Sequence, residues 1–126
     1  MTLVHIPVSL GELIDKITIL EIKRERLSGP AREHVLEELR LLEAALEGAN
    51  LAIDADLCQQ LRTVNRSLWE IEDAIREQER LGDFGERFIA LARSVYRSND
   101  HRAALKRRLN ELHGSGLIEQ KSYAAY

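Results

Sequence analysis

The chain has 126 residues and a formal net charge of −3 at pH 7. About half of the residues are Ala, Glu, Lys, Leu or Arg and only seven are Gly and two Pro, a composition that is typical of long helices and argues against a sheet protein. The negative net charge argues against nucleic acid as a partner, and no apolar run approaches the length of about 18 residues that spans a membrane. The single cysteine, Cys58, excludes an internal disulfide framework and favours a cytoplasmic protein.

The N-terminal half of the chain predicts two shorter helices after an extended lead-in over residues 1–8. Ser9 and Glu12 form a capping-box pattern, in which the Ser side chain accepts from a backbone N–H and the Glu side chain reaches back to the cap. Apolar residues at helical spacing predict a first helix over residues 10–27, which ends at Ser28-Gly29-Pro30. A second helix with one apolar face is predicted over residues 31–47.

The C-terminal half predicts two long helices. Asp54 is the predicted cap of a helix over residues 55–81, whose apolar positions alternate by four and three in a heptad pattern. A second capping box, Asp83 to Glu86, predicts a fourth helix over residues 84–113, and a tail follows over residues 117–126. The apolar residues that this tail offers for docking are Leu117, Ile118, Tyr123 and Tyr126.

These elements predict one all-α domain over residues 1–126. We expect a four-helix, largely antiparallel bundle in which two long helices form a hairpin and two shorter helices brace it. Unmatched ends of the long pair would expose apolar side chains, which favours a homo-oligomer or a helical protein partner.

Ser98 and Arg102 interrupt the apolar seam of the fourth predicted helix. Burial of an arginine is unfavourable unless it is paired and hydrogen-bonded. Between Arg93 and Arg108 there are six cations and one anion, which is a local positive excess on an acidic protein. Three interpretations remain open: a solvated face, a site for a phosphate or carboxylate, and internal pairing with the third helix. The candidates for that pairing are Glu70, Glu72 and Asp73, with Arg93, Arg97 and Arg102.

The anion-site interpretation assigns the surrounding polar residues to a ligand. The predicted ligand-binding residues are Arg93, Tyr96, Asn99, Asp100, Arg102, Lys106 and Arg107. The predicted supporting residues, which would face the ligand or hold the cations in place, are Glu12, Asp15, Lys16, Trp69, Glu72 and Asp73. In this interpretation an Arg102→Met variant loses the ligand and keeps the fold. The sequence identifies no cofactor, catalytic residue or metal ligand, and the four scattered histidines do not predict a zinc site.

The alternative function is that of a small all-α enzyme acting on a phosphorylated or carboxylated metabolite. Glu12-x-x-Asp15 and Glu70-x-x-Asp73 each place two carboxylates one turn apart, and two facing pairs can hold Mg²⁺. In these pairs the chain resembles all-α nucleotide pyrophosphohydrolases, and its first helix, with Ile14, Asp15, Ile17 and Arg26, is similar to that of all-α chorismate mutases. This alternative predicts a general acid or base with a pKa shifted by burial. The candidates are Glu12, Asp15, Glu72 and Asp73.

Blocks along nearly the whole chain point to one family. They are Ser9–Glu12, Leu13–Lys23, Leu68–Asp73 with Arg76, Phe88–Tyr96, Asn99-Asp100 with Arg102-Ala103, Lys106-Arg107 with Asn110, and Gly114-Ser115 with Lys121–Tyr123. In these blocks the chain resembles a family of small bacterial proteins classed as a domain of unknown function. The resemblance implies an association with genes for glycosyltransferases and helical-repeat proteins, hence with surface-polysaccharide loci, and implies no activity or cofactor. The blocks include the polar residues singled out above, so we expect a binding or accessory module for a ligand such as a sugar nucleotide.

Overall fold

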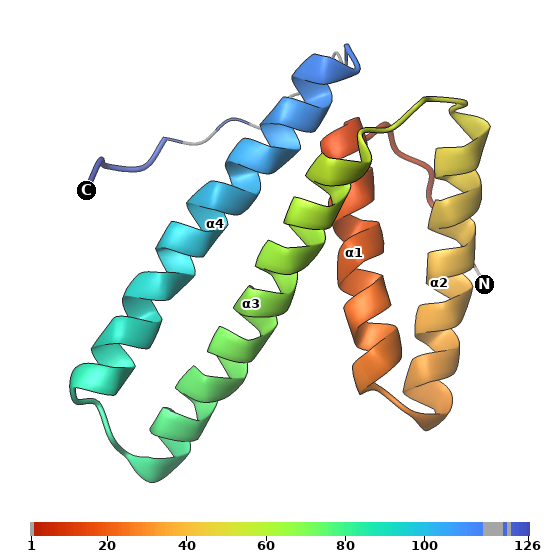
Figure 1. Cartoon of the computed structure of the whole chain (residues 1–126). Coiled ribbons are helices and arrows are strands. Elements are labelled where there is room, and N and C mark those ends of the chain that lie inside the picture. Colours follow the sequence, from red (N-terminus) through yellow and green to blue (C-terminus); the bar gives the residue numbers. More distant parts are fainter. Residues whose placement is uncertain (1, 115–119, 121) are drawn as a thin grey trace.

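The computed structural model describes residues 2–114, 120 and 122–126, and within those ranges the chain forms four helices and no strand. The helices are α1 (Leu10–Arg26), α2 (Gly29–Gly48), α3 (Ala55–Leu81) and α4 (Glu86–Leu112). They run alternately down and up, so that α1 with α2 and α3 with α4 form two antiparallel hairpins (Figure 1). The predicted all-α, largely antiparallel bundle with two long and two shorter helices is therefore confirmed. None of the described helices combines the length and the apolar character needed to cross a membrane.

The helix ends confirm two of the predicted caps and correct a third. Ser9 accepts a hydrogen bond from the Glu12 N–H at 3.1 Å, and Asp54 accepts one from the Leu57 N–H at 2.9 Å. The capping box predicted at the start of α4 is wrong, because the cap is Gly85, which has no side chain to accept a hydrogen bond from the first turn. The Asp83 carboxylate instead accepts from the Gly85 N–H at 3.0 Å, which holds a turn ahead of the helix, so α4 begins two residues later than predicted.

We expect an Asp54→Ala variant to lose about 1 kcal/mol of stability, because the substitution leaves an N-terminal N–H of α3 without its partner. Chemical denaturation of the variant measures this loss. The matched control is Asp56→Ala, which removes a second carboxylate from the same turn, where it bonds only the exposed Gln60 side chain. Equal losses in both variants would show that general charge, and not the cap, is responsible.

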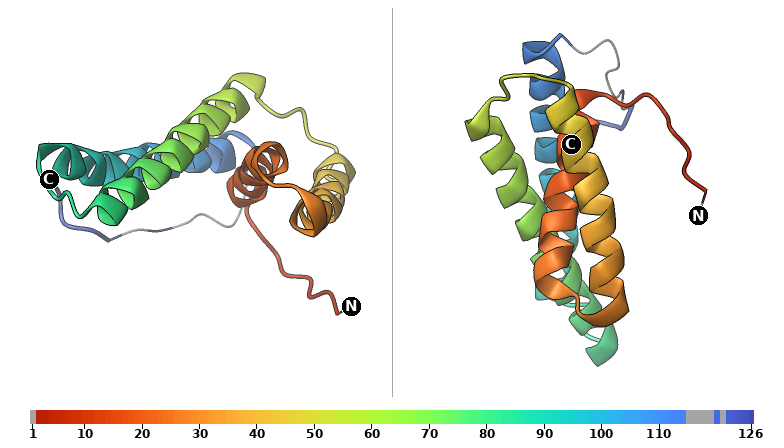
Figure 2. Two further views of the ribbon diagram at one scale, coloured as in Figure 1. Left: turned by 90° about the horizontal axis from the view of Figure 1, so that it is seen from below. Right: turned by 90° about the vertical axis from the view of Figure 1, so that its right-hand side faces the viewer.

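Except for Ile22, the buried apolar side chains form two clusters, one on each side of α1. The first cluster joins α1, α3 and α4 and consists of Ile14, Leu57, Leu61, Val64, Leu105 and Leu109. The second cluster joins α1 and α2 and consists of Ile17, Leu20, Val35 and Leu39. Seen end-on, α1 lies between α2 and the α3–α4 pair (Figure 2). Because α1 contacts all three other helices, it is the element that positions everything else.

The far part of the α3–α4 pair, residues 68–97, extends beyond this core, and we call it the distal hairpin. α1 ends at Arg26, beside Trp69, and does not accompany the distal hairpin to its tip (Figure 1). No apolar side chain of the distal hairpin is fully buried. The heptad pattern predicts a continuous seam, but only the half of the seam that α1 covers is closed from water.

Candidate functional site

A network of buried polar side chains lies where α1, α3 and α4 meet. Asp15 of α1 is only 1% exposed. Its carboxylate accepts hydrogen bonds from Nε of Arg102 at 2.8 Å, from Nη2 of the same guanidinium, and from Nδ2 of Asn65 at 2.9 Å. The Asn65 amide also donates to the Thr18 hydroxyl at 2.8 Å, and that hydroxyl donates to the Asp15 carbonyl at 2.8 Å. One residue from each of α3 and α4 is thus bound to the same carboxylate.

This network keeps Asp15 ionised. Burial raises the pKa of Asp15, but the hydrogen bonds from Arg102 and Asn65 and the charges of Arg102 and Lys106 together bring that pKa below its ordinary value of 3.8. A carboxylate that is covered and held ionised neither reaches a substrate nor exchanges a proton near neutral pH. The role of general acid or base therefore does not fit Asp15.

A second set of contacts fixes the first turn of α1 against α4. The Gly11 N–H donates to Oδ1 of Asn110 at 2.7 Å, and Nζ of Lys106 lies 2.8 Å from Oε2 of Glu12. Lys106 is only 6% exposed, and the carboxylate of Glu12 balances its charge. A Cβ at Gly11 would lie 2.4 Å from the Lys106 carbonyl oxygen, which explains why glycine occupies a helical position that otherwise disfavours it. The close approach sets the place of Asp15 one turn further along α1.

Beside the network, a cleft of about 510 Å³ opens between α1, α3 and α4, and we call it the Trp69 cleft. Its lining residues are Ile19, Asn65, Leu68, Trp69, Glu72, Asp73, Arg76, Asn99 and Arg102. Trp69 is the chain's single tryptophan, and the Arg26 guanidinium lies 6.0 Å from its ring centroid. Asn65 and Arg102 belong both to the network and to the cleft, so buried bonds hold two of the polar groups of its lining in place.

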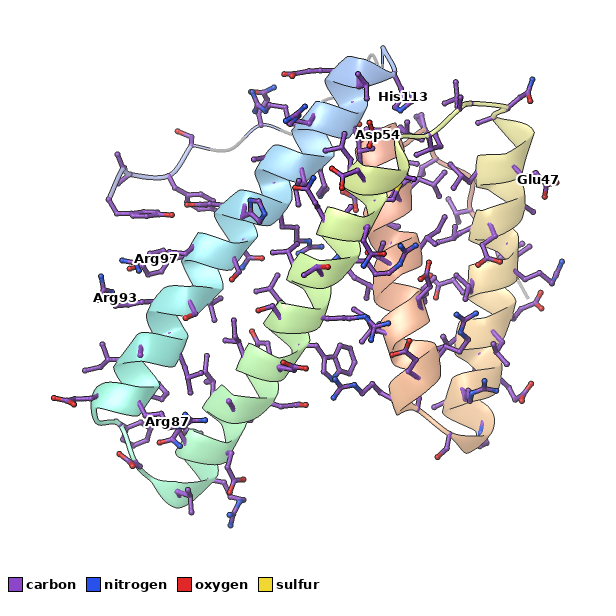
Figure 3. All side chains as sticks on the ribbon, in the orientation of Figure 1. Glu47, Asp54, Arg87, Arg93, Arg97 and His113 are labelled. Carbon is purple, nitrogen blue, oxygen red and sulfur yellow. The ribbon has the colours of Figure 1, made fainter. Side chains whose placement is uncertain are left out.

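The structure gathers part of the predicted site in this cleft. The predicted residues that line it are Trp69, Glu72, Asp73, Asn99 and Arg102, and Asp15 lies behind Arg102. Glu12 and Lys106 pair with each other at the start of α1, away from the lining. Lys16, Arg93 and Arg107 are exposed and line neither this cleft nor the one described next. Arg93 and Arg97 project from the side of α4 that faces away from α3 (Figure 3).

Tyr96 and Asp100 face a second cleft, of about 640 Å³, on the other side of Asn99. The last four residues of the tail form its opposite wall, and the rings of Tyr96 and Tyr126 lie 4.9 Å apart. A hydrogen bond to Asp100 raises the pKa of Tyr126. Of the tail residues offered for docking, Tyr126 contacts Tyr96 and Tyr123 lines the same cleft, although both remain largely exposed. Leu117 and Ile118 lie outside the described residues.

One of the three open interpretations, pairing between the cations of residues 93–108 and the acids of α3, does not apply to the ion pair of Arg102 with Asp15 of α1. The acids of α3 have other partners. Glu70 and Asp73 lie 3.9 and 3.8 Å from Arg26, and Glu72 lies 3.7 Å from Arg76. The two carboxylate pairs of the enzyme alternative thus face cations. Among the residues that the structure describes, no three His, Cys, Asp or Glu side chains are grouped to hold a metal ion.

Several residues that build this site, Asn110 among them, were not among the predicted site residues. Thr18 and Asn65 complete the network, Gly11 permits the close approach, and Arg76 lines the cleft. A readable signal existed for two of them. Glycine in the first turn of an apolar helix indicates a close contact, and Asn65 directly follows a seam position, where an amide needs a buried partner.

No curated protein and no solved structure matches this chain. One family model does match it, over residues 4–126, which is nearly the whole chain and includes every residue of the network and the cleft. Its description assigns no activity, and it agrees with the resemblance at the level of a family whose function is unknown. The chain therefore belongs to the family of unknown function DUF6165.

Proposed function

We propose that the protein is a cytoplasmic binding or accessory module whose Trp69 cleft receives a small ligand that carries a phosphate or carboxylate, such as a sugar nucleotide. The supporting observation is the composition of the cleft, which combines one indole ring, two guanidinium groups, two amides and two carboxylates over a buried polar network. A concave site with a few oriented polar groups and an aromatic surface is the usual form of a small-molecule site.

Each lining residue has a role that follows from its chemistry. The guanidinium group of Arg76 matches the oxygens of a phosphate or carboxylate, and that of Arg102 is held at the cleft by its two bonds to Asp15. The Arg76 side chain is 78% exposed, and its ion pair with Glu72 is long, at 3.7 Å. Because such an exposed pair is weak, Arg76 can turn toward an anion at little cost in free energy. The Trp69 ring offers a flat surface to a base or sugar ring.

The remaining polar groups of the cleft suit hydroxyl groups. The amides of Asn65 and Asn99 both donate and accept, whereas the carboxylates of Glu72 and Asp73 accept. In this proposal the predicted residues outside the cleft act indirectly. Lys106 and Glu12 hold α1 in place, Tyr96 and Asp100 flank Asn99, and the exposed cations attract anions over a longer range. Those exposed cations are Lys16, Arg93 and Arg107.

The association with glycosyltransferase genes in bacteria, which the sequence resemblance implies, is part of the same proposal. A module encoded beside such enzymes would meet sugar nucleotides as their donor substrates. The enzyme alternative uses the same cleft, with Glu72 or Asp73 as the general acid or base, because Asp15 is covered. Turnover of a bound probe would favour this alternative over simple binding.

We expect uridine diphosphate glucose to shift the emission of Trp69 and to raise the melting temperature, because a ligand that binds only the native state stabilises it by mass action. Uridine diphosphate and inorganic phosphate serve as smaller probes of the anionic part. Since the chain has one tryptophan, its fluorescence reports on this cleft alone. The absence of any change in emission and melting temperature with all three probes would contradict the proposal.

An exposed pair of arginines on α3 provides the matched variants for this test. Arg76→Ala is expected to weaken binding at least tenfold, which corresponds to about 1.4 kcal/mol. Arg80→Ala is the control, because Arg80 lies one turn further along, is ion-paired with Glu77 and does not line the cleft. Equal weakening by both variants would indicate a general effect of charge and would reject the cleft as the site.

A further inference from the structure

The protein exposes more surface than a compact chain of its mass. Its accessible surface is 8592 Å². A compact monomer of 14.4 kDa is expected to expose about 6,800 Å², so the excess is roughly 1,800 Å². A standard interface between two proteins buries about 800 Å² on each partner. The excess is therefore large enough to supply a stable interface.

The distal hairpin provides one apolar part of this surface, and the extended lead-in provides another with Leu3, Val4, Ile6 and Val8. Leu68, Ile71 and Ile75 of α3 and Leu91 and Val95 of α4 continue the heptad seam, yet each remains partly open to water. Near the tip, further apolar side chains are more than half exposed. They are Leu81, Phe84 and Ile89. Two helices cannot enclose an apolar stripe on their own, so this region needs another layer of helix to form a core.

The charges on the distal hairpin favour a second copy of the same surface as that layer. The α3 part, residues 68–81, carries five carboxylates and two guanidinium groups. The α4 part, residues 86–97, carries one carboxylate and three guanidinium groups. Because an acidic helix lies beside a basic helix, each copy can place its acidic helix against the basic helix of the other copy.

We propose that two copies of the chain pair through their distal hairpins and form a four-helix dimer core. The apolar seam of α3 continues in this segment as far as Ile75, and the buried Gln78 takes the next seam position. The seam of α4 runs through Phe84, Phe88, Leu91 and Val95, as the core of such a bundle requires. The partner's hairpin covers the seam that α1 leaves open. The proposed interface and the Trp69 cleft meet at Leu68, which belongs to the seam and also lines the cleft, whereas Phe84 and Leu91 do not line it.

Sedimentation of the full chain at micromolar concentrations tests this inference, with twice the monomer mass of 14.4 kDa as the expected result. The melting temperature should also rise with protein concentration, because the native dimer is stabilised by mass action. A monomer that persists up to several hundred micromolar would overturn the proposal.

Two variants locate the interface. Phe84→Glu should weaken the dimer at least tenfold without unfolding the monomer, because Phe84 is already 53% exposed and packs only edge-on to Phe88. Leu91→Glu places a charge within the seam and should do the same. Leu51→Glu is the matched control, since Leu51 is an exposed leucine in the α2–α3 connection, at the opposite end of the molecule from the distal tip. If both distal variants remained dimeric and folded by circular dichroism, or if Leu51→Glu dissociated the dimer equally, the distal hairpin would be rejected as the interface.

Discussion

Replacing Arg102 by methionine is expected to destabilise the protein by about 3–5 kcal/mol at pH 7, because the substitution leaves the Asp15 carboxylate buried without its counter-charge. Chemical denaturation at equilibrium measures the loss. In the anion-site interpretation of the sequence, this variant would lose the ligand and keep its stability. The pairing with Asp15 changes that expectation, and it is why Arg76 is the better probe of ligand binding.

The dependence of this loss on pH identifies its origin. In the wild-type protein the pKa of Asp15 is below 3.8, so the stability that Asp15 contributes is present above that pH and is lost as the pH falls through the folded-state pKa. In Arg102→Met, burial remains without the guanidinium, and the pKa of Asp15 rises above its unfolded value. The penalty is then largest near pH 7 and shrinks as the pH falls through the raised pKa of Asp15 toward 3.8, because the buried carboxyl takes up a proton in that range. A loss that is constant between pH 7 and pH 3.5 would show that Asp15 is not its cause.

A double variant supplies the control. Asp15→Leu combined with Arg102→Met replaces both charges by apolar groups, and it is expected to recover most of the stability that the single Arg102→Met variant loses. If the double variant were as unstable as the sum of the two single variants, the two residues would not be energetically coupled, contrary to the short contacts between them.

Gly11→Ala is expected to cost about 1–3 kcal/mol, although alanine is the better helix former. The added Cβ would lie 2.4 Å from the Lys106 carbonyl oxygen, so α1 and α4 must move apart and the 2.7 Å bond between the Gly11 N–H and Asn110 must lengthen. Because the same turn of α1 positions Asp15, the displacement should also disturb the Trp69 cleft. Denaturant unfolding and the emission maximum of Trp69 report the two effects separately.

Gly48→Ala is the matched control for this substitution. Gly48 is the last residue of α2, its φ is not positive, and no atom lies within 4 Å of the position its Cβ would take. Its replacement should be neutral or stabilise the protein by up to about 1 kcal/mol. A similar loss in both variants would mean that the contact between α1 and α4 is not the reason for glycine at position 11.

Local sequence pattern was enough for the secondary structure of this protein. The bounds of α3 agree with the prediction at both ends, because Asp54 caps it and Gly82, with φ of +67°, ends it. Predicted and observed bounds of the other helices differ by at most two residues. At the start of α4 the deviation has a local cause, since Asp83 bonds the N–H of Gly85 and holds a turn in place of a cap.

The site could not be predicted from local pattern in the same way, because helical spacing tells which residues share a face but not which helix that face contacts. The sequence singled out Arg102 as an arginine that interrupts an apolar seam and left three interpretations open, of which one was pairing with the acids of α3. The actual partner, Asp15, is 87 positions away on α1. Only the packing of α1 against α4 brings the two side chains together, and that packing depends on a single missing Cβ at Gly11. The same packing turns Arg102 and Lys106, two of the six cations of residues 93–108, toward α1 and leaves the Trp69 cleft open beside them.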